Sequence, residues 1–98
     1  MPVVMMMQWD GATLDQYDRL LETVNWEGDP PAGGMFHVAA FDGSGLRITD
    51  IWETAEQFQQ FVEQRLMPGV KALGVPGEPR VEIYPVHRSH APAYRPVP

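Results

Sequence analysis

The sequence predicts an α+β domain with the element order β-α-β-β-α-β. Three observations lead to this fold class. Strand and helix patterns alternate along the 98 residues, a tight-turn sequence joins the middle two strands, and both helices begin at a capping box. This order favours a ferredoxin-like architecture, in which a four-stranded antiparallel sheet carries two helices on one face. We expect residues 1–87 to form this single domain and residues 88–98 to form a proline-containing C-terminal arm.

The first third of the chain predicts a strand, a helix and a long loop. Residues 3–9 are apolar at nearly every position, which is typical of a strand covered on both faces. Thr13 and Gln16 form a capping box that opens the first helix. Its apolar stripe consists of Leu14, Tyr17, Leu20, Leu21 and Val24. The loop over residues 25–34 holds two prolines and three glycines, so we expect no regular element there.

A hairpin is predicted in the middle of the chain. Two strand patterns flank the turn sequence DGSG, at residues 35–41 and 46–53. A two- or four-residue loop places His37 opposite Asp50 and Met35 opposite Trp52, all on one face. A three-residue loop or a bulge would break this register. The other face carries Phe36, Val38, Ala40, Arg47, Thr49, Ile51 and Glu53.

The second helix is expected over residues 55–66. Thr54 and Gln57 form its capping box. Its apolar residues recur at helical spacing, at Phe58, Phe61, Val62 and Leu66. Pro68 should end or kink the helix because proline lacks the N–H that the preceding turn requires. We expect a short helical piece to resume over residues 70–73.

The last strand is predicted over residues 80–87, and Pro85 within it indicates an edge position or a bulge. Two helices cover only one face of such a sheet. The opposite face keeps apolar side chains, among them Phe36, Val38, Ala40 and Ile51. A second copy of the sheet is the simplest cover for this face, so we expect a homodimer.

Composition limits the classes of partner. The net charge of −6 argues against nucleic acid and anionic membranes, because both attract clustered Lys and Arg. The sequence has no cysteine, which excludes disulfides and thiolate metal sites. The apolar run over residues 3–7 is too short to span a bilayer and lacks the features of a signal peptide. We therefore expect a cytoplasmic protein with no membrane partner.

The predicted hairpin, the segment DIWET at residues 50–54 and the helix with Phe58 and Phe61 resemble the dimeric α+β barrel superfamily. Within it, they are most similar to the antibiotic-biosynthesis-monooxygenase-like group. The resemblance covers roughly residues 3–87 and implies homodimers whose sheets pack face to face, with a ligand cleft between sheet and helices. The activities it implies are cofactor-independent oxygenation of polycyclic phenols, haem breakdown, polyketide cyclisation and isomerisation of small acids. Some members have no known activity.

The same resemblance bears on cofactors and on the cleft. Its haem-degrading branch places a ligating histidine on the second helix, where this chain has Val62 and no histidine. We therefore expect no haem of that type and no other cofactor. Trp52 matches the tryptophan that relatives keep on the cleft side of the third strand. The resemblance thus implies that Met35, His37, Asp50 and Trp52 face the cleft.

His37 and Asp50 are the candidate catalytic residues. A carboxylate beside an imidazole fixes its tautomer and raises its basicity, which suits a general base near neutral pH. In an apolar cleft such a base deprotonates a phenol or an enol, and the aromatic anion can then pass an electron to oxygen. The structural alternative is a buried pair whose two members satisfy each other's hydrogen bonds.

Candidate substrate-binding residues are the wide side chains expected near this pair. They are Trp9, Tyr17, Met35, Trp52, Phe58 and Phe61. Such residues line pockets for flat apolar ligands, and they also form ordinary hydrophobic cores. Trp26 lies in a loop that either rims the cleft or is an ordinary loop. His87 and His90 are three residues apart without a third ligand nearby, so we expect no metal site.

Three functions remain open from the sequence. The first is a cofactor-independent monooxygenase-like or cyclase-type enzyme that acts on an aromatic or polyketide-like compound. The second is a non-catalytic ligand-binding or stress-associated dimer. The third is a structural dimer that contacts a partner through its C-terminal arm. One fold hosts many functions, so the site has to decide between them.

Overall fold

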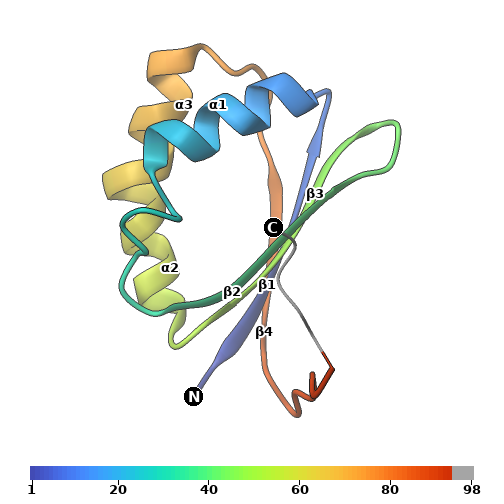
Figure 1. Cartoon of the computed structure of the whole chain (residues 1–98), viewed down its shortest axis with the longest axis vertical. Coiled ribbons are helices and arrows are strands. Elements are labelled where there is room, and N and C mark those ends of the chain that lie inside the picture. The colour runs from blue at the N-terminus through green and yellow to red at the C-terminus, as the bar shows by residue number, and fades with distance from the viewer. Residues whose placement is uncertain (94–98) are drawn as a thin grey trace.

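The computed structural model describes residues 1–93, and the arrangement of its elements confirms the predicted fold class. The elements are β1 (Val3–Asp10), α1 (Leu14–Val24), β2 (Gly34–Phe41), β3 (Gly45–Trp52), α2 (Ala55–Phe61), η1 (Val62–Leu66), α3 (Met67–Leu73) and β4 (Arg80–Pro85). The strands form one sheet in the order β2-β3-β1-β4, with every neighbouring pair antiparallel. All helices lie on the same side of this sheet (Figure 1).

The hairpin register is confirmed near the turn and changes near the start of β2. The confirmed pairs are His37 with Asp50, Ala39 with Ile48 and Phe41 with Leu46. The predicted pairing of Met35 with Trp52 is wrong, because a bulge between Gly34 and Phe36 places Gly34 opposite Trp52. Gly33 precedes the bulge with a φ of 85°, and its carbonyl accepts a hydrogen bond of 2.8 Å from the backbone N–H of Glu53.

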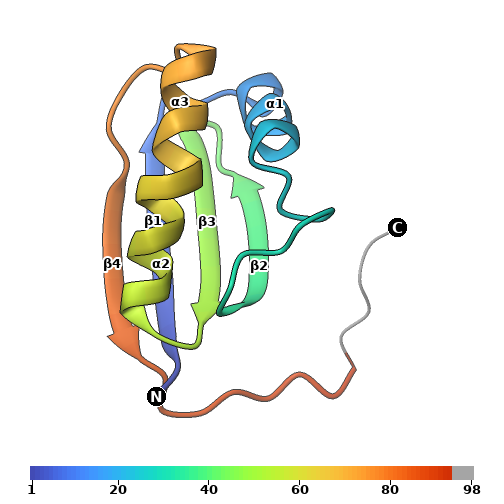
Figure 2. The same cartoon turned by 90° about the vertical axis from the view of Figure 1, so that its left-hand side faces the viewer.

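The second helix does not end at Pro68. The segments α2, η1 and α3 follow one another without a break and form one column in Figure 2. The η1 segment is a π-helix, in which the N–H of Met67 donates to the carbonyl of Val62, five residues earlier. This wider turn precedes the residue that lacks an N–H and lets the helix continue through it. The helix ends at Gly74, which has a φ of 65°.

The hydrophobic core lies between the sheet and the helices. The odd-numbered residues of β1 contribute Met5, Met7 and Trp9 to it, because side chains alternate along a strand. Trp9 and Trp52 are almost completely buried, and the Trp9 indole N–H donates to the carbonyl of Pro76 at 3.0 Å. Leu14, which was predicted in the apolar stripe of α1, is 62% exposed and lies outside this core.

The opposite face of the sheet carries no helix among residues 1–93 (Figure 1). One row of side chains crosses all four strands on this face, formed by Phe36, Ile51, Val4 and Tyr84. Val38 and Met6 in the next row are each nearly half exposed. The predicted apolar character of this face is therefore present.

The described chain ends with an edge strand and an irregular segment. The strand β4 is an edge strand with Pro85 as its last residue, as the proline indicated, although the strand is two residues shorter than predicted. The segment after it runs away from the domain (Figure 2). Residues 94–98 of the predicted arm lie outside the described residues. No helix within residues 1–93 is long and apolar enough to cross a membrane.

Candidate functional site

The two candidate catalytic residues are hydrogen-bonded. The strands β2 and β3 place His37 opposite Asp50, and Nδ1 of the imidazole lies 2.7 Å from Oδ1 of the carboxylate. The other carboxylate oxygen accepts a hydrogen bond of 3.1 Å from the Trp52 indole N–H. Asp50 is only 3% exposed, and a buried carboxylate needs such partners to remain charged. This pair therefore forms a satisfied polar group inside an apolar core.

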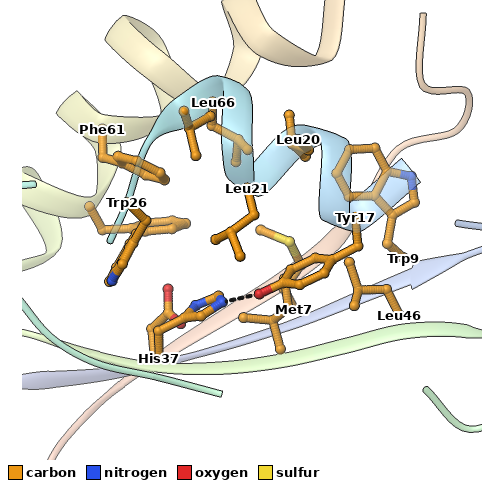
Figure 3. A pocket seen from close by; sticks show the side chains of 14 residues that line it. Met7, Trp9, Tyr17, Leu20, Leu21, Trp26, His37, Leu46, Phe61 and Leu66 are labelled. Atoms are coloured by element: carbon orange, nitrogen blue, oxygen red, sulfur yellow. Dashed lines mark hydrogen bonds and ion pairs between the residues drawn. The ribbon is translucent and has the colours of Figure 1, made fainter. Parts of the chain in front are cut away.

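Tyr17 extends this network from the helix α1. Its hydroxyl lies 2.6 Å from Nε2 of His37 (Figure 3). A carboxylate only accepts hydrogen bonds, so Nδ1 of a neutral His37 carries the proton on the Asp50 side. The lone pair of Nε2 then accepts the Tyr17 hydroxyl proton. Sequence reasoning placed Tyr17 in the pocket wall but did not find this hydrogen bond.

Tyr17 stays protonated at neutral pH. Burial, together with the negative charges of Asp50, Asp18 and Glu27, raises the pKa of its hydroxyl to about 12. The phenol therefore acts as a hydrogen-bond donor toward His37. Both ring nitrogens of His37 consequently have a partner in this structure.

A small inner cavity lies behind this network. Its volume is about 50 Å³, and its lining is almost entirely apolar. It is lined by Met7, Trp9, Tyr17, Leu20, Leu21, Val24, Trp26, His37, Leu46, Ile48, Asp50, Phe58, Phe61 and Leu66. An apolar cavity of roughly 150 Å³ is enough for one benzene ring. The inner cavity is therefore too small for an aromatic ligand in this conformation.

An outer hollow adjoins the inner cavity. Its volume is about 310 Å³, which is within the lower range of small-molecule sites. It is lined by Tyr17, Leu21, Trp26, Glu27, Gly34, Met35, Phe36 and His37. Four of these residues, namely Tyr17, Leu21, Trp26 and His37, also line the inner cavity. They form the partition where the two spaces adjoin, and Figure 3 shows these four side chains around the inner cavity.

Trp26 is the central aromatic residue of this partition. Its ring centroid lies 5.0 Å from that of His37 and 5.4 Å from those of both Trp52 and Phe61. It meets Trp52 and Phe61 edge to face, which is a favourable geometry for aromatic rings. The sequence left its role open, because a position within a loop does not reveal what the loop packs against. The only indication was a large aromatic residue among glycines and prolines.

The other predicted site residues divide into three groups. Trp9, Phe58 and Phe61 line the inner cavity. Met35 lies on the bulge, is 57% exposed and lines only the outer hollow. Trp52 lines neither space, and it contacts the site through the hydrogen bond to Asp50 and through its ring contacts with Trp26 and Phe61.

Within residues 1–93, no three or more histidine, aspartate or glutamate side chains are grouped to hold a metal ion. His87 and His90 are exposed and follow β4.

Comparison with known proteins gives matches at the level of structure. No protein-family model and no curated protein sequence matches the chain. The structure is similar to that of SnoaB, a cofactor-independent oxygenase from Streptomyces nogalater, with a TM-score of 0.67 and 10% identity. The match covers 90% of this chain and 95% of SnoaB. This chain has the fold of the antibiotic-biosynthesis-monooxygenase-like proteins.

Two further structures illustrate the range of proteins with this fold. The ActVA-Orf6 monooxygenase of Streptomyces coelicolor, solved with nanaomycin D, matches with a TM-score of 0.60 and 15% identity over 94% of this chain and 92% of that chain. A protein of unknown function from Nitrosomonas europaea matches with a TM-score of 0.67 and 14% identity over 95% and 96%. The resemblance stated from the sequence is thus confirmed for the fold, and identities this low establish nothing finer.

Proposed function

We propose that this chain is a monooxygenase-like or cyclase-type enzyme that needs no cofactor and acts on an aromatic or polyketide-like compound. The observation that carries this proposal is the hydrogen-bonded series Tyr17–His37–Asp50 beside a hollow of about 310 Å³. His37 is the general base, and Asp50 orients it. Tyr17, Trp26 and Met35 form the walls that receive the ligand.

The proton path in this proposal begins at a ligand hydroxyl. The hydroxyl donates to the Tyr17 oxygen, and Tyr17 passes its own proton to Nε2 of His37. Because Asp50 holds the Nδ1 proton, the resulting imidazolium keeps a counter-charge within hydrogen-bond distance. The ligand leaves this step as a phenolate or an enolate. For a cyclase, the enolate carbon is the nucleophile that closes the ring.

For an oxygenase, molecular oxygen is the second substrate. The phenolate gives one electron to oxygen, and the phenoxyl radical and superoxide then combine at a ring carbon. The imidazolium returns its proton to the peroxide, and loss of water leaves a carbonyl at that carbon. A phenol and oxygen are thereby converted to a quinone and water. SnoaB, whose fold this chain shares, is described as a cofactor-independent oxygenase, which supports this class of reaction.

We also propose that the working unit is a homodimer. The apolar row formed by Phe36, Ile51, Val4 and Tyr84 supports this proposal, because exposed apolar surface of this kind is typical of an interface. The face is the same on each copy, so a twofold axis brings two identical patches together.

A non-catalytic ligand-binding dimer is the second candidate. One observation favours it: both ring nitrogens of His37 already have partners, so the network is satisfied without a substrate. Under this alternative the protein has no catalytic turnover, and loss of the His37 imidazole changes only its affinity for the ligand.

Oxygen uptake with a panel of hydroxynaphthalenes and hydroxyanthracenes tests the proposed function. We expect His37→Gln to lower any enzyme-dependent rate by 100-fold or more, in line with general-base catalysis. His90→Gln is the matched control, because His90 is exposed and distant in sequence from the site. Equal rates for the wild type and His37→Gln would remove His37 from the mechanism. Ligand binding without turnover would favour the second candidate.

A further inference from the structure

The indole of Trp26 occupies an aromatic slot. The slot is formed by His37, Trp52 and Phe61, whose ring centroids all lie within 5.4 Å of the Trp26 ring. Trp26 comes from the loop after α1, whereas the three slot residues come from β2, β3 and α2 (Figure 3 shows Trp26 between Phe61 and His37). A flat bicyclic ring from a loop therefore fills a site that strands and a helix build.

The sizes of the two spaces show what opening this slot requires. The inner cavity of about 50 Å³ admits no aromatic ring, whereas the outer hollow of about 310 Å³ does. Trp26 borders both spaces. Rotation of its indole out of the slot would join the slot to both spaces, so that a ligand ring entering through the outer hollow could occupy it. A ligand ring in the vacated slot would lie beside His37 and Tyr17.

The backbone on both sides of Trp26 is held in place. The Arg65 guanidinium donates to the carbonyls of Val24 and Asn25, which precede Trp26, and to that of Asp29, which follows it. The distances to Asn25 and Asp29 are 3.2 and 2.8 Å. With these anchors in place, a change of side-chain rotamer is the movement that moves the indole without breaking the loop.

The negative charge around the outer hollow restricts the charge of the ligand. Glu27 lines the outer hollow, and the adjoining hollow on the surface of α1 adds Asp18 and Glu22. Among residues 1–93, no Lys or Arg lines the inner cavity or either of these two hollows. A carboxylate ligand would meet negative charge without a cation to pair with it, and both charges would lose water.

We propose that the Trp26 indole occupies the position of the ligand's ring, and that the site takes a planar aromatic system of about two fused rings that carries a hydroxyl and no negative charge. This inference rests on the proposed function and names the ligand class of that site. Trp26 sets the size limit and has to rotate before the ring is bound. Glu27 and Asp18 set the charge preference.

Binding of 2-naphthol and 2-naphthoate tests both parts, because the two probes share a ring and differ in charge. The protein is labelled with 5-fluorotryptophan, and the three tryptophan resonances are followed by ¹⁹F NMR. Trp26→Phe assigns the Trp26 resonance. With 2-naphthol we expect this resonance to move toward the value of an exposed indole, while that of Trp9 changes little. Trp26→Ala should bind 2-naphthol about tenfold more tightly than the wild type does if the wild-type indole is rotated out of the slot in about a tenth of the molecules.

The charge preference has its own matched variants. We expect 2-naphthoate to bind at least tenfold more weakly than 2-naphthol, and Glu27→Gln to narrow this difference. Glu63→Gln makes the same change of charge at an exposed position that lines none of these spaces. It should leave the difference in affinity between the two probes unchanged. Equal affinity for the two probes would overturn the charge preference.

Two other results separate this inference from the proposed function. Binding of 2-naphthol without any change of the Trp26 resonance would overturn the displacement of the indole and leave the ligand site in place. Failure of 2-naphthol to bind either the wild type or Trp26→Ala would overturn the inference and the proposed ligand site together.

Discussion

At His37 both ring nitrogens are engaged, and this determines how a ligand reaches the base. Nδ1 bonds to Asp50 at 2.7 Å and Nε2 to the Tyr17 hydroxyl at 2.6 Å. A ligand hydroxyl has to bond to Tyr17 or replace it. The pairing of His37 with Asp50 was predictable because the hairpin loop fixes which residues face each other. The Tyr17 contact was not, because it depends on how far α1 lies from the sheet.

Tyr17 gives the first prediction at the residue scale. Its pKa is raised from 10.0 to about 12, so the unfolded chain loses this proton at a lower pH than the folded protein. The stability that comes from burying the neutral phenol is complete below pH 10 and falls as the pH rises from 10 to 12. Because Tyr17 is only partly buried, we expect a loss of about 1 kcal/mol, well under the full value for two pKa units.

Urea denaturation at pH 9 and pH 11 measures this loss. Tyr17→Phe should lose less stability between the two pH values than the wild type does. An identical pH dependence in the wild type and Tyr17→Phe would show that Tyr17 is not desolvated in the folded protein.

At the scale of elements, two departures from the predicted structure shape the site. The bulge at Gly34 turns Met35 outward, so it borders the outer hollow and not the core. The paired glycines before β2 were compatible with a bulge, but no local rule chooses between a bulge and a regular strand start. The π-helix before Pro68 keeps α2 and α3 continuous. It also carries Arg65, whose three carbonyl partners, in Val24, Asn25 and Asp29, lie about 40 residues earlier in the chain.

The hydrogen bonds from Arg65 to three backbone carbonyls give a prediction about the loop that holds Trp26. Arg65→Met should lower the free energy of unfolding by about 1.5–3 kcal/mol, the typical value for hydrogen bonds to a charged group. Chemical denaturation measures this change. Arg19→Met is the matched control, because Arg19 forms only an exposed ion pair with Asp15, and such pairs contribute about 0.5 kcal/mol or less. Equal stability of the two variants would mean that Arg65 does not hold the loop.

At the scale of the whole molecule, the sheet separates two surfaces with different uses. One face and the helices enclose the core and the candidate site, while the other presents an apolar row. The alternation of side chains made this division predictable, since His37 and Phe36 have to point to opposite faces. The small volume of the inner cavity was not predictable, because it depends on how side chains from six elements and the loop after α1 pack.

The proposed homodimer can be tested on the open face. Val38 is 46% exposed on this face, and Val38→Asp would bury a charge in the proposed interface. We expect this variant to sediment as a monomer at concentrations where the wild type sediments as a dimer. Leu14→Asp makes a comparable change on α1, on the other side of the sheet, and should remain dimeric. A Val38→Asp dimer would place the interface elsewhere.

The proposed site brings a ligand hydroxyl from the hollow beside His37 to the Tyr17–His37–Asp50 network. The most direct test is ¹⁵N NMR of the histidine side chains with and without 2-naphthol. We predict that Nδ1 of His37 stays protonated and that the resonance of Nε2 changes on binding, whereas His90 shows no change. A bound ligand that leaves both nitrogens of His37 unaffected would show that this network does not receive the ligand hydroxyl.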